Sequence, residues 1–367
     1  MRGLDRGLRL MALKGVREAA VVAPADPEAR RRWEFDQAIE GNRDQWGRPK
    51  IMLPDGSKEV GYRRASSYGA PLEDTSALDK WKLREVARGI SQRSELQLAV
   101  TRSEIGLFSS EWDEQKAAKR ELDELCEKAM EIVGSGAKAV IGTAEHHIFE
   151  KVDLGLDPGH IPAQWKPDLL AYTELTRGFE SVAVERFVVQ DDHQVAGTLD
   201  RAVELRHDHE APDGTLLEAG SVIIGDVKTA QRMDFAGAKF AVQCWTYASG
   251  TPYNPITKMR EPWDHTPPRQ DWAVIFHVAS GSGQARLYWV DLAAAAMAAE
   301  IVREVYVWRN RLGKAMISAA AENFVATAML ARTIEELSEA HKRAVSQGVW
   351  TEGLKAVFGA CKRELIS

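Results

Sequence analysis

Hydrophobic and polar positions follow two different periods along this chain. Runs in which apolar residues alternate or cluster over a short length, as in strands, lie between polar turns in the second half of the sequence. They are SVAVERFVVQ (181–190), QVAGTLDRAVEL (194–205), SVIIGDVKTA (221–230), WAVIFHVAS (272–280) and QARLYWVDL (284–292). The last two flank a Gly/Ser-rich segment, residues 281–283, which predicts a hairpin turn between them.

Apolar residues spaced three or four apart predict helices over most of the remaining chain. The expected helices cover residues 72–90, 110–133, 136–155, 166–177, 235–249 and 293–310, and two shorter ones follow to the end. Residues 48–64 predict a hairpin around Pro54–Asp55–Gly56. This order of elements indicates an α/β fold with a central mixed sheet flanked by helices. We expect a core at 106–312, a helical and hairpin region at 1–105 and a helical tail at 313–367.

The overall charge argues against a protein that simply coats a polyanion. The formal net charge is −6, while the apolar share of 44% and the charged share of 28% are ordinary for a globular protein. An enzyme that acts on nucleic acid is still compatible with this charge, because a carboxylate-lined metal site makes the total more negative until cations bind.

Cysteine usage and the N-terminal sequence both indicate the cytoplasm. The three cysteines, Cys126, Cys244 and Cys361, are far apart and form no CxxC motif, so neither a disulfide framework nor a zinc ribbon is indicated. Arg and Lys interrupt Met1–Ala20 every few residues. We therefore expect neither a signal peptide nor a membrane span there.

Polar side chains occupy four positions where a strand or helix would otherwise be apolar. Asp226 and Lys228 are two apart on one strand, so they point to the same side, and Asp200 interrupts the preceding strand. His146 and Glu150 lie four apart on one helix face. Gln243 and Tyr247 have the same spacing on a later helix.

Together these residues offer several oxygen ligands and one imidazole, a set that suits Mg²⁺ or Mn²⁺ better than Zn²⁺. Such ions bridge phosphate oxygens and lower the pKa of bound water, which points to phosphodiester hydrolysis. Each feature alone has an ordinary explanation: an Asp-x-Lys strand is usually a surface ion pair, and a single His is usually a hydrogen-bonded core or surface residue. The hydrolytic interpretation depends on their joint order and on the elements that carry them.

The four segments resemble the motifs of the RecB-like branch of the PD-(D/E)XK nuclease superfamily. They are GTAEHH (142–147), GTLD (197–200), GDVKT (225–229) and QCWTY (243–247), in the family's order and on the expected elements. The resemblance covers residues 140–250. More loosely, residues 62–90 and the helical tail resemble RecB-like exonucleases encoded by phages of actinobacteria.

The resemblance implies a restriction-endonuclease-like core and assigns a role to each motif residue. His146, Asp200, Asp226 and the Val227 carbonyl would bind one or two Mg²⁺ or Mn²⁺ ions, with Glu185 as a further ligand and Glu145 or His147 as second choices on the helix. Lys228 would position or activate the attacking water. The residues expected to brace the site or contact DNA are Gln243, Tyr247, Arg201 and Thr229.

One departure concerns the four cysteines that bind an iron–sulfur cluster in some members of this branch. This chain has three, none appropriately placed, so we expect no cluster and expect packing through Leu78 and Trp81 to hold the N-terminal region. A Walker A motif is also absent from the sequence, so no nucleotide cofactor is expected.

The sequence therefore predicts a metal-dependent DNA exonuclease of phage recombination, replication or repair. Its partners would be DNA ends or single strands, with a phage recombinase or single-strand-binding protein as a further candidate, in the cytoplasm of a bacterial host. The alternative is a non-catalytic DNA-end-binding accessory protein on the same fold. Strand preference would depend on stacking aromatic residues, for which Trp46, Trp81 and Trp245 are candidates and a core position is the ordinary explanation.

Overall fold

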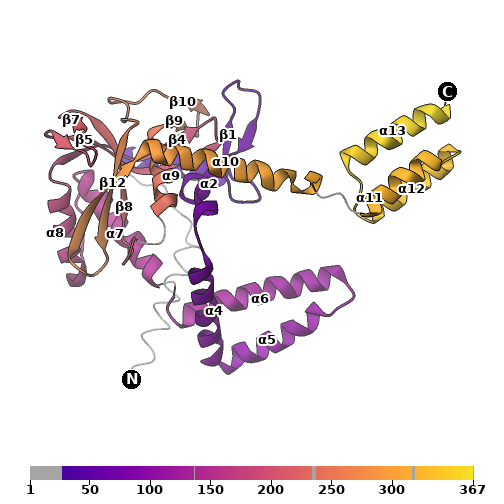
Figure 1. The fold of residues 1–367 in the computed structure, drawn as a ribbon. Coiled ribbons are helices and arrows are strands. Elements are labelled where there is room, and N and C mark those ends of the chain that lie inside the picture. The colour runs from indigo at the N-terminus through magenta and orange to yellow at the C-terminus, as the bar shows by residue number, and fades with distance from the viewer. Residues whose placement is uncertain (1–26, 136, 234–236, 316–318, 367) are drawn as a thin grey trace. The chain divides into compact units, whose positions relative to one another are not determined.

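A computed structural model describes residues 27–135, 137–233, 237–315 and 319–366 of the chain (Figure 1). The chain divides into two compact units, Met1–Ala299 and Glu300–Ser367. Each unit is described by itself below. Within the described ranges, none of the helices combines the length and apolar character needed to cross a membrane.

The larger unit is built on a mixed sheet of eight strands, as the alternation of apolar residues predicts. The strands are β3 (Arg63–Arg64), β4 (Phe179–Gln190), β5 (Val195–Leu205), β8 (Val222–Lys228), β9 (Thr251–Asn254), β10 (Met259–Arg260), β11 (Trp272–Ala279) and β12 (Gln284–Asp291). Their spatial order is β10-β9-β4-β5-β8-β11-β12, and β3 pairs with β5 beside this path. β8 is parallel to β11 and β3 is parallel to β5, whereas the remaining described pairings in this sheet are antiparallel.

Helices of the larger unit flank this sheet, which confirms the α/β class with a mixed central sheet; α11 to α13 belong to the smaller unit. The described helices are α2 (Pro27–Gly41), α3 (Ala65–Tyr68), α4 (Ser76–Ser91), α5 (Ser94–Leu107), α6 (Trp112–Ile132), α7 (Ala137–Asp153), α8 (Lys166–Leu175), α9 (Gly237–Ala248), α10 (Leu292–Ala315), α11 (Ala319–Leu330), α12 (Ile334–Ser346) and α13 (Glu352–Ile366). Two short hairpins complete the unit, β1 (Lys50–Met52) with β2 (Glu59–Gly61) and β6 (His209–Glu210) with β7 (Leu216–Leu217).

The two faces of the sheet contact different helices because side chains alternate along each strand. Phe149 of α7 and Tyr172 of α8 pack in one apolar cluster with Val203 of β5 and with the inner residues of β8 and β11. On β8, the alternate position Asp226 faces α9 instead, where it accepts a hydrogen bond from Gln243. The face toward α7 and α8 is therefore largely apolar, and the face toward α9 carries Asp226 beside buried apolar residues such as Ile224.

Two predicted boundaries fall inside continuous helices, and one helix was not expected. The boundary at residue 105 lies within α5 and the boundary at residue 312 lies within α10. The unexpected helix is α5. Its apolar residues do not form one stripe, since Leu96 is buried while Leu98 and Ile105 are exposed. Without such a stripe, the spacing of apolar residues does not predict a helix. The tail after α10 contains three helices, α11 to α13, rather than two. They share a core formed by residues such as Phe324, Leu337 and Phe358.

The expected anchoring of the N-terminal region through Leu78 and Trp81 is wrong. Both side chains are exposed on α4, which packs against α5 and α6. The region is held elsewhere: Ile51 and Tyr62 are buried in a cluster with Phe187 of β4, and β3 joins the central sheet beside β5. The N-terminal hairpin is therefore part of the core that supports the sheet.

Gly89 is the point of closest approach between α4 and α6. A Cβ at this position would collide with the carbonyl oxygen of Ala129. We expect Gly89→Ala to lower the free energy of unfolding by about 1–3 kcal/mol, because the helices must separate to admit the methyl group. Urea unfolding followed by circular dichroism measures this change.

Gly41, at the end of α2, is the matched control because a Cβ there would meet open space. Gly41→Ala should leave stability equal to or slightly above that of the original protein, since Ala favours helix over Gly. Equal midpoints for Gly89→Ala and Gly41→Ala would contradict the close contact between α4 and α6.

Candidate active site

β5 and β8 separate where the motif residues lie. Their antiparallel pairing runs from Glu204↔Val222 to Arg201↔Gly225, and the next residues along are Asp200 and Asp226. Beyond that point the Val227 N–H donates a 2.8 Å hydrogen bond to Oδ2 of Asp200. The Asp200 carboxylate thus takes the place of the backbone carbonyl that would accept this N–H in a continued ladder. One side chain therefore both satisfies the backbone of β8 and belongs to the candidate site.

Two glycines of the motifs are required by close approach. A Cβ on Gly142 would lie 2.7 Å from Oγ1 of Thr229, and one on Gly225 would lie 2.6 Å from Cε2 of Phe276. These positions let α7 lie against the end of β8 and let Phe276 cover β8 from the neighbouring strand. The glycines therefore fix the distance between the His-bearing helix and the Asp-x-Lys strand.

Three carboxylates form a row across adjacent strands. The register of β4 on β5 sets Glu185 across from Asp200, and the register of β5 on β8 sets Asp226 on the other side of Asp200. Glu185 adopts a left-handed backbone with φ of 52°, which costs a residue with a side chain about 1–3 kcal/mol. Such strain persists where the surroundings impose it and is frequent at functional sites.

His146 is the residue of α7 that faces this row. Its Nδ1 lies 3.9 Å from Oδ2 of Asp200. The two second choices point elsewhere: Glu145 is buried and accepts a 2.9 Å hydrogen bond from Ser280 Oγ, whereas the His147 side chain is mostly exposed. Burial lowers the pKa of His146 despite the nearby Asp200 charge, so its imidazole is neutral, as a metal ligand must be.

Asp226 and Lys228 point to the same side, as strand geometry predicts, and their charged groups are in contact. Asp226 is fully buried. Burial raises the pKa of Asp226 to about 6; the Asp200 charge adds to the rise and Lys228 opposes it. Burial alone would lower the pKa of Lys228, but the charges of Asp226 and Asp200 outweigh it and raise that pKa. Lys228 is therefore an ammonium group in this structure.

Gln243 and Tyr247 brace the row from α9. The side-chain amide of Gln243 donates to Oδ1 of Asp226 and to the Tyr247 hydroxyl, both at 3.1 Å. Both side chains are largely buried. Because the two residues are four apart on α9, they lie on one helix face and Gln243 holds the Asp226 carboxylate in place. Both also line the small cavity together with Asp200, where a ligand could contact them.

Glu185 adds to an excess of negative charge at the row. Burial raises the pKa of Glu185 to about 8, and the charges of Asp200 and Glu150 raise it further. Neighbouring carboxylates raise each other's pKa because their negative charges repel. A bound divalent cation would remove this repulsion and lower those pKa values.

The donor types fit Mg²⁺ or Mn²⁺, although their present spacing does not form a finished site. No group of three or more His, Cys, Asp or Glu side chains within the described ranges is arranged to hold an ion. Among the described residues, Oδ2 of buried Asp226 has no hydrogen-bond partner, and it forms an ion pair with Lys228. Three carboxylates and one imidazole are the ligands that hard divalent ions accept. Ion binding would require Asp226 to exchange its contact with Lys228 for the metal.

Arg201 does not lie where a substrate could contact it, contrary to expectation. Its side chain is 1% exposed and lies on the opposite face of the sheet, where it pairs with Asp153 of α7 and contacts the Tyr172 hydroxyl at 3.2 Å. Its Nη1 also donates to the Asp200 carbonyl at 3.0 Å. Arg201 therefore fixes the backbone beneath Asp200 and ties it to the helix that carries His146.

Two cavities flank the contact between His146 and Asp200. The larger, about 1060 Å³, is lined by His146 and by uncharged polar groups that include Thr229 and Ser280. The smaller, about 490 Å³, has charged residues of both signs in its lining: Asp36, Glu40 and Asp200 together with Arg43 and Arg64. Thr229 thus faces the space beside the site, as expected of a substrate contact.

The cavity-lining residues of the N-terminal region were not found from the sequence. Arg43 and Arg64 are far from the four motifs in the sequence; the pairing of β3 with β5 places Arg64 beside the site, and Arg43 lines the same cavity from the segment after α2. A cluster of Arg residues around the predicted hairpin at 48–64 was the available signal.

A pair of buried carboxyls was also missed. Asp168 accepts hydrogen bonds from the Gly281 and Gly283 amides at 2.6 and 2.7 Å, and burial raises the pKa of nearby Glu145 to about 7. They attach the β11–β12 turn to α7 and α8, beside the larger cavity.

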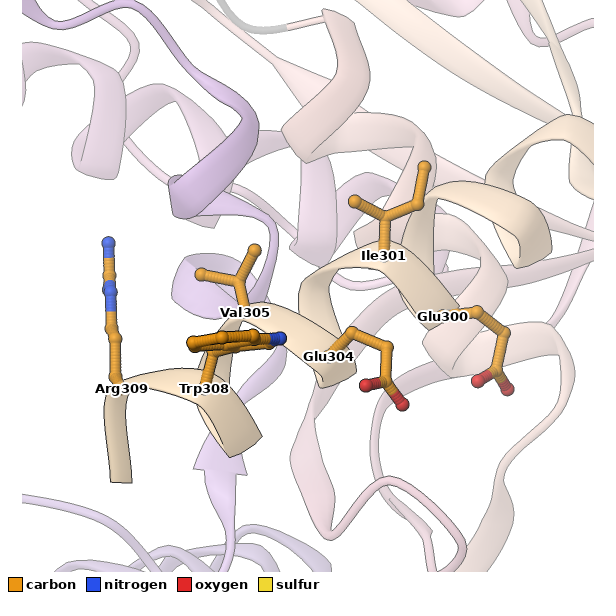
Figure 2. A pocket seen from close by; sticks show the side chains of 6 residues that line it. All are labelled: Glu300, Ile301, Glu304, Val305, Trp308 and Arg309. Carbon is orange, nitrogen blue, oxygen red and sulfur yellow. The ribbon is translucent and has the colours of Figure 1, made fainter. Parts of the chain in front are cut away.

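Figure 2 shows a further hollow, of about 490 Å³, on the smaller unit. Its lining comes from a single helix, α10, and consists of Glu300, Ile301, Glu304, Val305, Trp308 and Arg309. Because one helix face encloses little, we assign no site to it.

No family model and no curated protein matches this chain. The functional interpretation therefore depends on the motifs and on the geometry described above.

Breaking the Arg201–Asp153 pair should destabilise the protein. We expect Arg201→Met to lower the free energy of unfolding by about 3 kcal/mol, because it leaves the buried Asp153 carboxylate unpaired. Adding Asp153→Asn should recover much of the loss. Urea unfolding of both variants measures these changes.

Arg177, which pairs with Glu174 at the surface, is the control. Arg177→Met should change stability by less than about 0.5 kcal/mol. A loss in Arg201→Met no larger than this would show that Arg201 has no structural role.

Proposed function

We propose that this protein is a metal-dependent deoxyribonuclease of the RecB-like PD-(D/E)XK type that acts as an exonuclease on DNA ends. The observation that carries the proposal is the row of Glu185, Asp200 and Asp226 on neighbouring strands β4, β5 and β8, where the pairing of β5 with β8 ends, with His146 and Lys228 beside it. The exonuclease assignment is supported by the resemblance to phage exonucleases.

Each residue of the row has a distinct part in phosphodiester hydrolysis. Asp200, Asp226, His146, the Val227 carbonyl and Glu185 would hold Mg²⁺ or Mn²⁺. When bound, the ion supplies positive charge to the phosphate and lowers the pKa of a coordinated water.

The side chains around the metal ligands orient the reacting groups. Lys228, as an ammonium, donates hydrogen bonds to the attacking water and stabilises the negative charge that develops on the phosphate. Gln243 keeps Asp226 oriented through its 3.1 Å hydrogen bond. The two cavities leave room on both sides of the scissile phosphate.

The accessory-protein alternative is disfavoured by the electrostatics of the row. A protein that only binds DNA gains affinity from cations near phosphates, and carboxylates at the same place repel the backbone. Three carboxylates beside a cavity lined by Arg43 and Arg64 are useful where a metal ion mediates between them and a phosphate.

Metal-dependent cleavage is the first test. Purified protein should degrade linear DNA with Mg²⁺ or Mn²⁺, and EDTA should stop it. Asp226→Asn and Lys228→Met should each reduce the rate about a hundredfold or more, since both remove charge used at the phosphate. Release of acid-soluble nucleotides measures the rate.

Lys82→Met, on the exposed surface of α4, is the control for loss of a lysine charge and should retain full activity. Full activity in the Asp226 and Lys228 variants would refute the assignment. Persistent DNA binding without cleavage in either metal would favour the accessory protein.

End dependence is the second test. An exonuclease should shorten end-labelled linear DNA progressively and leave closed circular DNA intact over the same time course. Cleavage of the circle at the rate of the linear form would replace the exonuclease proposal with an endonuclease.

A further inference from the structure

The three tryptophans considered for base stacking differ sharply in their surroundings. Trp245 is partly buried on α9 and packs against His193, with ring centroids 4.8 Å apart. Trp81 is 37% exposed on α4. Trp46 is 69% exposed, so the fold gains little from burying it.

A built turn holds Trp46 in place. Oδ1 of Asp44 accepts hydrogen bonds from the backbone amides of Trp46 and Arg48, both at 2.9 Å, and Oδ2 accepts one from Arg48 Nε at 2.7 Å. This brings the Arg48 guanidinium to 4.6 Å from the centroid of the Trp46 ring. One face of the indole is therefore covered by a cation, and the large exposed fraction places the other face in solvent.

The turn forms the rim of the small cavity beside Asp200. Arg43 Nη1 donates a 2.9 Å hydrogen bond to the Gly47 carbonyl, next to Trp46. Arg43 and Pro49, on either side of the turn, both line the cavity that contains Asp200. Arg43 is paired with Glu40, whereas Arg64, an exposed residue, lines the same cavity. A strand whose phosphates occupy this cavity would pass close to the turn that carries the indole.

We propose that Trp46 is a stacking platform for an unpaired base of the DNA strand that enters the site, which makes single-stranded or frayed ends the preferred substrate. This rests on the proposed nuclease function. A base can stack on the indole only when it is unpaired, so this arrangement favours single-stranded or frayed ends. An open aromatic face near Arg side chains that can contact the backbone, here Arg43 and Arg64, is an arrangement by which proteins bind single strands without sequence preference.

The test separates bases from phosphates. All variants are made in a Lys228→Met background with Mg²⁺, so that the strand stays intact, and binding is measured by fluorescence anisotropy. The probes are a labelled oligothymidylate, a strand of abasic sites of the same length and a blunt duplex. Trp46→Ala should weaken oligothymidylate binding about tenfold and leave the abasic strand unchanged, because stacking of one base contributes about 1–3 kcal/mol.

Two further variants keep the outcome interpretable. Trp46→Phe retains an aromatic face and should recover most of the affinity. Trp112→Ala is the matched control: Trp112 is also 69% exposed, with the Lys119 ammonium 5.6 Å from its ring. It lies on α6, from which no described residue lines either cavity, whereas Arg43 and Pro49 on either side of Trp46 line the smaller one. Trp112→Ala should bind every probe like the background protein.

Unchanged oligothymidylate binding in Trp46→Ala would overturn the proposal. An equal loss of affinity for the abasic strand would also overturn it, by showing that the turn contacts phosphates and not bases. An equal loss of affinity for the blunt duplex would overturn it as well, by showing that Trp46 stacks on the end of paired DNA. These binding results do not require cleavage. A protein that fails to hydrolyse DNA but shows the Trp46 effect would therefore refute the nuclease and keep the stacking site.

Discussion

Burial of like charges in a single row is the constraint on which the rest of this structure depends. Asp226 and Asp200 are neighbours across two strands, and burial raises the pKa of Asp226 to about 6. Glu185 lies across the next strand, with a pKa raised by burial to about 8. A chain would not retain such a row for stability, because each desolvated carboxylate costs free energy that an apolar residue would not. The surrounding elements offset this cost through Lys228, Gln243 and the backbone amide of Val227.

The same constraint explains why the framework around the row is so heavily connected. Arg201, beneath Asp200, is itself held by Asp153 and Tyr172 from two helices. On the other side of the sheet, Tyr62 donates a 2.7 Å hydrogen bond to Asp191, which also accepts one from Arg260. Strands that carry buried carboxylates need such supports to keep one geometry, since a loose site would let the charges separate into solvent.

The positions of the row residues could be predicted from the sequence, whereas the surrounding residues that hold the strands in place could not. Strand alternation alone placed Asp226 and Lys228 on one side, and helical spacing placed Gln243 and Tyr247 on one face. The same alternation could have excluded Arg201 as a substrate contact, because its neighbour Asp200 must point the opposite way. The left-handed backbone at Glu185, the partners of Arg201 and the exposure of Trp46 depend on contacts between distant segments. No local pattern carries that information.

Asp200 has a further consequence for how this chain can vary. Its Oδ2 atom both faces His146, at 3.9 Å from Nδ1, and accepts the Val227 N–H at 2.8 Å. Charge at the site and closure of the sheet edge are thus properties of one side chain. A substitution that changes the charge at the site also removes the acceptor for the Val227 N–H. Asp200 therefore has little freedom to change, even where a different side chain could supply an equivalent ligand. The constraint on Glu185 is of another kind, because its left-handed backbone conformation disfavours most side chains whatever their charge.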